Sequence, residues 1–284
     1  MVKKSEVVPH AMGTATLFVL LVFIDNGHAE SNANVVVTKD VQYGVGLIEN
    51  GASRQPLFLD IYRVGQGAEL KPTLILIHGG GFSGGDKSNY EKVARQFAAQ
   101  GFVCFSINYR LTGNKPPNGI ASTFEDAKTA VRWIRAHQTK YGVDPKRIAA
   151  MGSSAGASIA DTLALSEASE YRPDLDVPEN NPSVDSSIQA CIDHSGGCAA
   201  SGTADSEDPP ILIMHAIGDS KSPFSCAEHL RDRITKAGGT CRFLALPGSD
   251  HVPPLETTFN GKTLFDHVLA FLNEHLIASI PPGG

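Results

Sequence analysis

Apolar residues fall into two patterns along this chain, short nearly continuous runs and longer stretches with helical spacing. The runs over 73–77 and 102–107 are typical of strands buried on both faces of a sheet. Residues 90–100 carry apolar side chains at helical spacing and are followed by Gly101, which indicates the end of a helix. The alternating stretch 57–62 and the segment 35–45 predict two further strands, the latter at a sheet edge. Further strands are expected at 147–151, 188–192, 210–215 and 241–246, and further helices at 123–140, from 157, at 225–237 and at 264–277.

Strands that alternate with helices predict an α/β fold, a mostly parallel sheet with helices on both of its faces. The length of 284 residues suits one large domain, and the 42% of apolar residues can build a sizeable core. Residues 167–187 are rich in Pro, Asp and Asn and predict a surface loop. No internal repeat or second-domain boundary is evident, so we expect one domain over residues 30–284.

The first 29 residues differ in composition from the rest of the chain. Lys3 and Lys4 precede an apolar run over 11–24, and Gly27 and Ala29 supply small residues at a cleavage site. This pattern predicts a secretory signal peptide over 1–29, and hence a secreted or periplasmic protein. The apolar run is short for a membrane span, so we expect no stable span in the mature chain. An uncleaved N-terminal anchor is the alternative.

The net charge and the spacing of histidines and carboxylates bear on whether nucleic acid, a metal or a cofactor is expected. The net charge is −6 and no long basic run occurs, so nucleic acid is not an expected partner. No group of histidines and carboxylates has the spacing of metal ligands, and we therefore expect neither a metal nor another cofactor.

The segment Gly152-Ser153-Ser154-Ala155-Gly156 lies between a predicted strand and a predicted helix. Strand, G-x-S-x-G and helix together form the nucleophile-elbow pattern, in which a sharp turn presents the central serine above the sheet. Glycines on either side let the strand and the helix approach closely. We therefore interpret Ser154 as a candidate nucleophile, with a glycine-rich turn capped by serines as the alternative.

A second motif, His78-Gly79-Gly80-Gly81, directly follows the predicted strand 73–77. Glycines at such a position let the backbone approach a reacting acyl carbon. The N–H groups of Gly80 and Gly81, together with that of Ala155, could then bind a developing oxyanion. A flexible glycine loop without a catalytic role is the alternative.

An acid and a base follow two later strands. Asp219 comes after the strand 210–215 and His251 comes after the strand 241–246, so both are expected at the same sheet edge as Ser154. The chain order Ser, Asp, His is that of α/β-hydrolases. Asp193, at the end of the strand 188–192, remains a weaker alternative for the acid, whereas Asp208 precedes its strand and belongs to the opposite edge.

The remaining histidines have other interpretations. His78 belongs to the glycine loop, His215 ends a strand, and His267 falls inside a predicted helix, so structural roles are expected for all three. His194 could line the pocket, without an evident mechanism.

Five cysteines in an exported chain suggest a disulfide. Cys226 and Cys241 lie at opposite ends of a predicted helix, roughly 16 Å apart, which is too far for a bond. Cys198 and Cys226 follow neighbouring strands at the same sheet edge, and this pair is therefore favoured. Cys191 with Cys198 is the alternative, and Cys104 is expected to be a buried thiol.

Taken together, these motifs give a family resemblance over residues 35–278. The chain resembles secreted α/β-hydrolase esterases with an HGGG loop, and is similar to the hormone-sensitive-lipase group and to bacterial acetylxylan and feruloyl esterases. The resemblance implies an α/β-hydrolase fold, with Ser154, Asp219 and His251 as the triad and Gly80, Gly81 and Ala155 as oxyanion donors. The matching segments are 78–82, 108–111, Asp126 with 132–134, 141–145, 152–156 and 215–219.

Two features differ from the pattern of the hormone-sensitive-lipase group and narrow the range of expected substrates. The acid stretch 218–223 is closer to the xylan and feruloyl esterase branch, and few residues precede the first strand to build a cap. The segment 195–208 is polar and short, unlike a lipase lid. We therefore expect no large cap, a preference for short acyl groups, and tolerance of bulky alcohols or sugars.

The sequence thus predicts a serine carboxylesterase that hydrolyses small-molecule or polysaccharide esters of acetyl or feruloyl type through an acyl-enzyme. A serine peptidase or amidase with the same residues is one alternative. A catalytically silent binding module on the same fold is another, because a fold does not determine a function.

Overall fold

A computed structural model of the protein describes residues 34–65 and 69–277. The predicted signal peptide, residues 1–29, lies outside the described residues. All of the described residues fall in one compact unit of the chain.

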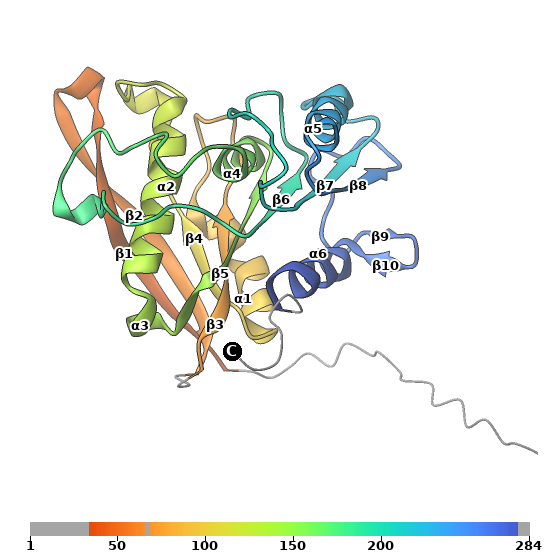
Figure 1. Cartoon of the computed structure of the whole chain (residues 1–284), viewed down its shortest axis with the longest axis horizontal. Helices are drawn as coiled ribbons and strands as arrows, with labels where there is room; N and C mark the ends of the chain where they lie inside the picture. Colours follow the sequence, from red (N-terminus) through yellow and green to blue (C-terminus); the bar gives the residue numbers. More distant parts are fainter. Residues whose placement is uncertain (1–33, 66–68, 278–284) are drawn as a thin grey trace, which may run out of the picture. The chain divides into compact units, whose positions relative to one another are not determined.

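An eight-stranded sheet forms the centre of this unit (Figure 1). Its strand order is β1-β2-β4-β3-β5-β6-β7-β8. The pairs β1–β2 and β2–β4 are antiparallel, and every other neighbouring pair is parallel. All eight strands were predicted, and their bounds are Val35–Ile48 (β1), Ser53–Val64 (β2), Lys71–Ile77 (β3), Val103–Ile107 (β4), Val143–Ser153 (β5), Ala190–His194 (β6), Ile211–Ala216 (β7) and Cys241–Leu246 (β8).

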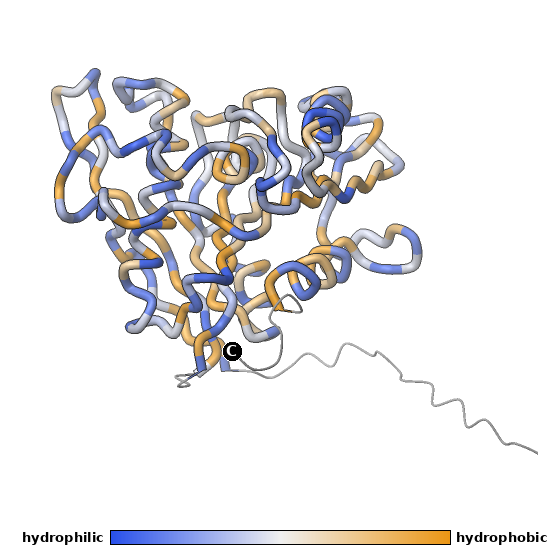
Figure 2. Tube along the Cα trace, viewed as in Figure 1, coloured by the Kyte–Doolittle hydropathy of each residue, from blue (hydrophilic) through white to orange (hydrophobic). Residues whose placement is uncertain are grey.

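Helices cover both faces of the sheet, as the alternating pattern predicted. The helices are Glu91–Ala99 (α1), Ala121–Ala136 (α2), Gln138–Tyr141 (α3), Ala155–Leu165 (α4), Phe224–Lys236 (α5) and Leu264–Leu272 (α6). Apolar residues of α2, α4 and α5 pack in one core cluster, and those of α1 and α6 pack in a second cluster on the other face. Figure 2 shows apolar residues concentrated along the strands between these two layers. None of the described helices is both long and apolar enough to span a membrane.

The structure corrects two sequence-based expectations. The predicted helix 123–140 is divided, because α2 ends at Ala136 and His137 leaves the helical conformation with φ −105° and ψ 18°. At this break the ring of His137 stacks on Trp133, and its Nδ1 lies 2.8 Å from the Trp133 carbonyl oxygen. A short hairpin of Thr258–Phe259 (β9) and Lys262–Thr263 (β10) was not predicted.

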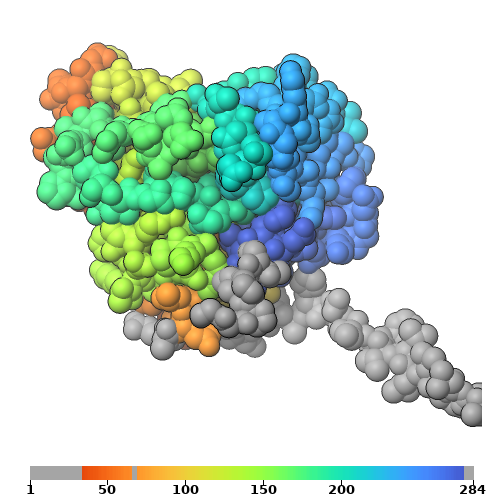
Figure 3. Space-filling model, viewed as in Figure 1, coloured from red at the N-terminus to blue at the C-terminus, as the bar shows by residue number. Residues whose placement is uncertain are grey.

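The long loop over 166–189 lies on the surface between α4 and β6, as predicted (Figures 1 and 3). Buried polar contacts hold it against the domain. Asp174 forms an ion pair with Arg110, and the Asn180 side chain bonds both backbone groups of Val45 in β1 at 2.8 Å. The candidate residues lie at the sheet edge where β5, β7 and β8 end.

Candidate active site

Ser154 lies in the sharp turn between β5 and α4. Its backbone has φ 54° and ψ −119°, a region that non-glycine residues rarely adopt and that costs free energy unless the surroundings impose it. The two glycines of the motif allow the turn. A Cβ on Gly152 would lie 2.0 Å from the carbonyl oxygen of Gly156, and a Cβ on Gly156 would lie 2.1 Å from that of Ile77. The close crossing of strand and helix thus requires glycine at both positions.

Ser154, His251 and Asp219 lie in one hydrogen-bonded row. The Nε2 atom of His251 is 2.8 Å from Ser154 Oγ, and its Nδ1 atom is 2.7 Å from Asp219 Oδ2. These residues come from the ends of β5, β8 and β7, which meet at one sheet edge because the strands are parallel. An imidazole held between a serine and a carboxylate can take the hydroxyl proton while the carboxylate fixes its tautomer.

The environment of Asp219 favours its ionised form. Burial raises the pKa of this carboxyl, but hydrogen bonds from His251 and from the N–H groups of Ser222 and Lys221 outweigh that effect and lower the pKa below its usual value. The N–H of Lys221 lies 2.8 Å from Oδ1 and that of Ser222 lies 3.0 Å away. Asp219 is therefore a charged acceptor for His251 at neutral pH.

The glycine loop forms a wall beside Ser154. Gly80 and Gly81 line the same cleft as Ser154 and His251, and Ala155 is the first residue of α4. The Gly80 carbonyl oxygen accepts the N–H groups of residues 83 and 84 at 3.1 and 3.0 Å, which fixes a tight turn.

His78, the first residue of this loop, has contacts in line with the structural role expected for it. It is buried and its ring stacks on Tyr109 with centroids 4.3 Å apart. The Tyr109 hydroxyl donates to the His78 carbonyl oxygen at 2.9 Å.

The alternative acids lie away from His251. Asp193 is buried at the end of β6, and its Oδ1 accepts the N–H of Gly196 at 2.6 Å. Burial raises the pKa of Asp193 and of the neighbouring Asp161. Asp208 caps the turn before β7 by accepting the N–H of Asp205, at the opposite sheet edge.

Three other histidines have identifiable surroundings. His215 is buried behind the acid, with Nε2 2.8 Å from the Ser222 carbonyl oxygen and 3.5 Å from Asp219 Oδ2. His267 contacts the Phe259 carbonyl oxygen at 2.9 Å. His194 lines the cleft; burial lowers its pKa to about 4, against the effect of a hydrogen bond with the Pro253 backbone.

The cleft above Ser154 has a volume of about 770 Å³. Two segments contribute to its lining, one with Asn89, Tyr90, Lys92 and Val93 and the other with residues 252–256. Lys92 and Glu256 form an ion pair between these segments. Sequence reasoning missed both segments, although residues 252–256 directly follow His251 and could have been found by that proximity.

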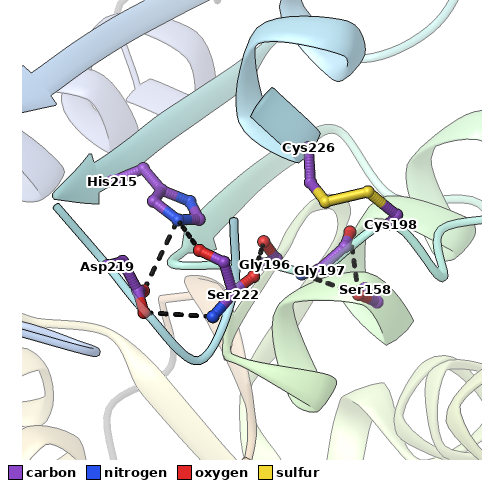
Figure 4. Close-up of a disulfide and its surroundings, with 8 residues drawn as sticks. All are labelled: Ser158, Gly196, Gly197, Cys198, His215, Asp219, Ser222 and Cys226. Atoms are coloured by element: carbon purple, nitrogen blue, oxygen red, sulfur yellow. Dashed lines mark hydrogen bonds and ion pairs between the residues drawn. A yellow bond between two sulfur atoms is a disulfide. The ribbon is translucent and has the colours of Figure 1, made fainter. Parts of the chain in front are cut away.

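The favoured disulfide, Cys198–Cys226, is confirmed, with a Cα–Cα distance of 5.0 Å (Figure 4). Cys104 and Cys191 are free and buried, as expected for Cys104 and contrary to the alternative pairing. Over the ranges 34–65 and 69–277, no group of three or more His, Cys, Asp or Glu side chains is arranged to hold a metal ion.

Comparison with known proteins places this chain in a family of hydrolases. The profile of the BD-FAE family matches residues 59–201. Esterase LipQ of Mycobacterium tuberculosis is 26% identical over 274 residues, which cover 83% of this chain and 62% of that protein. Carboxylesterase NlhH of the same organism is 40% identical over 96 residues, which cover 33% of this chain and 28% of that protein.

A solved structure resembles most of this chain. The propionate-bound thermophilic esterase Est2 of Thermogutta terrifontis has a TM-score of 0.67 and 25% identity, over 86% of this chain and 97% of that one. This likeness and the strand order confirm the predicted α/β-hydrolase fold. The chain spans less than two thirds of the length of the curated relatives described above.

Proposed function

The chain belongs to the BD-FAE family of α/β-hydrolases, which is similar to the hormone-sensitive lipases, and from this premise we propose that it is a serine carboxylic ester hydrolase. The observation that carries the proposal is the continuous row from Ser154 Oγ through His251 to Asp219. The esterases and carboxylesterases among its relatives support the same class of reaction.

The mechanism follows from this row. His251 Nε2 takes the hydroxyl proton as Ser154 Oγ attacks the ester carbonyl carbon, and the N–H groups of Gly80, Gly81 and Ala155 bind the oxyanion that forms. The tetrahedral intermediate then collapses, and His251 passes its proton to the departing alcohol. Water, activated by His251, hydrolyses the acyl-Ser154 ester by the same route and releases the acid.

The substrates that we propose are short-chain or carbohydrate-linked esters, of acetyl or feruloyl type. The cleft combines apolar residues such as Val93 and Leu255 with charged ones such as Lys92, Lys221 and Glu256, which suits a compact acyl group and a polar alcohol. A long acyl chain needs a deep apolar groove, since each buried methylene contributes roughly 0.8 kcal/mol. Est2 of Thermogutta terrifontis, which has a similar fold, binds propionate.

We further propose that the protein acts outside the cytoplasm. The pattern over residues 1–29 supports export, and the Cys198–Cys226 disulfide fits an oxidising compartment.

A panel of p-nitrophenyl esters from C2 to C16, with the matching amides and with acetylated xylan and methyl ferulate, tests the proposed activity. We expect the highest kcat/KM on C2 to C4 esters, with Ser154→Ala inactive on all of them. Higher kcat/KM on C10 to C16 esters would contradict the proposed acyl class. Amide turnover that exceeds ester turnover would identify a peptidase or amidase instead.

A further inference from the structure

The short loop over 195–198, after β6, contacts the nucleophile helix through a buried serine. Ser158 lies one turn beyond Ser154 in α4, and its Oγ accepts the N–H of Gly197 at 3.2 Å and donates to the carbonyl oxygen of Gly197 at 3.4 Å (Figure 4). The side chain is buried, so water cannot replace these bonds easily.

A second buried serine connects the same loop to the acid. Ser222 Oγ donates to the carbonyl oxygen of Gly196 at 2.6 Å, while its own N–H donates to Asp219 Oδ1 at 3.0 Å. The carbonyl oxygen of Ser222 lies 2.8 Å from His215 Nε2. Through Ser222, hydrogen bonds thus connect the turn that carries Asp219 to the loop and to His215 of strand β7, as Figure 4 shows.

A third buried serine connects the loop to the base. Ser195 Oγ accepts the N–H of Val252, the residue after His251, at 3.2 Å. Val252 has φ 58°, a conformation that a β-branched residue adopts only when its neighbours impose it. The bond from Ser195 is one of the contacts that holds this backbone, and therefore the residue next to His251.

Two further bonds fix the loop itself. The Cys198–Cys226 disulfide joins its end to the first turn of α5, directly after the acid turn. Asp193 Oδ1 accepts the N–H of Gly196 from below at 2.6 Å. The loop is therefore a rigid connector that reaches the segments of all three triad residues.

We propose that Ser158, Ser195 and Ser222 are positioning residues for the triad, and that the loop over 195–198 is the brace through which they act. This inference rests on the proposed function. None of the three serines contacts the reacting atoms; each holds one triad segment against the same loop. Because a misplacement of about 1 Å can cost 10²-fold in rate, loss of one contact lowers kcat without removing the substrate-binding cleft.

The test compares Ser222→Ala and Ser158→Ala with the matched control Ser186→Ala. Ser186 is likewise buried and donates to a backbone carbonyl oxygen, that of Ala168 at 3.3 Å, but it lies in the loop over 166–189. For each full-length variant, kcat and KM on p-nitrophenyl butyrate, the rate of Ser154 phosphonylation by a fluorophosphonate, and the Tm are measured.

We expect Ser222→Ala and Ser158→Ala to lower kcat and the phosphonylation rate at least tenfold, with KM within twofold of wild type. Ser186→Ala should lower the Tm comparably and leave kcat unchanged. Equal kcat values in all three variants would overturn the brace, even where Ser154→Ala is inactive and the proposed function holds. If Ser222→Ala does not fold, the kcat values of Ser158→Ala and Ser195→Ala are compared with that of Ser186→Ala. Lower values support the brace, and equal values overturn it.

Discussion

Replacing His194 by glutamine tests how strongly the domain disfavours a charged imidazole beside the cleft. His194 is 3% exposed, and burial lowers its pKa to about 4 from the ordinary value of 6.5. Glutamine keeps a side chain that can donate a hydrogen bond toward the Pro253 backbone, but it does not titrate. In the variant, this position therefore binds no proton in either the folded or the unfolded state.

The sign follows from proton binding. As the pH falls from 7 to 4, the unfolded chain binds a proton at His194 that the folded chain excludes, so the free energy of unfolding falls. A lowering of the pKa from 6.5 to about 4 corresponds to about 3 kcal/mol, nearly all of it lost between those two pH values. His194→Gln cannot bind this proton, so its free energy of unfolding should fall less between pH 7 and pH 4.

Urea unfolding at pH 7, 6, 5 and 4, followed by circular dichroism with the disulfide intact, measures the difference. We expect the wild type to lose about 3 kcal/mol more than His194→Gln between pH 7 and pH 4. His229→Gln, which replaces an exposed histidine, controls for loss of a histidine as such. Parallel pH profiles for wild type and His194→Gln would refute the reasoning.

Two further predictions concern the acid and the elbow. Asp219→Asn should lower kcat by about 10³- to 10⁴-fold, because His251 loses the acceptor that orients it, and Asp193→Asn should lower kcat less. Steady-state kinetics on one ester compares them, and the reverse ranking would show that Asp219 is not the acid. Gly152→Ala should destabilise the domain by about 3 kcal/mol or more in urea, because its Cβ would lie 2.0 Å from the Gly156 carbonyl oxygen. Gly113→Ala, with no heavy atom within 4 Å of its Cβ, is the control, and equal losses would contradict the prediction.

Much of the fold could be predicted because a buried parallel strand gives a continuous apolar run in the local sequence. Strands such as β3, β4 and β7 have their own apolar runs, and the direction of the parallel strands places the residues that follow them at one edge. The same reasoning correctly selected Cys198 and Cys226 as a pair, since both follow neighbouring strands. It also predicted that Ser154, Asp219 and His251 lie at a common edge, where the structure places them.

Other features depend on contacts that no local pattern contains. The division between α2 and α3 falls at His137, while the helical spacing of apolar residues continues through it. The hairpin of β9 and β10 has strands of two residues, too short for an alternating pattern. The pairing of Lys92 with Glu256 joins segments 164 residues apart, and only the folded chain brings them together at the cleft.

The most direct test of the account is to identify the residue that a fluorophosphonate labels. The folded protein and its Ser153→Ala and Ser154→Ala variants are treated with the reagent, and the modified peptide is sequenced by mass spectrometry. We predict one equivalent on Ser154 in the wild type and in Ser153→Ala, with loss of ester hydrolysis in proportion to labelling. Ser154→Ala should neither react nor hydrolyse esters. Label on Ser153, or ester turnover that persists in Ser154→Ala, would contradict the assignment of Ser154 as the nucleophile.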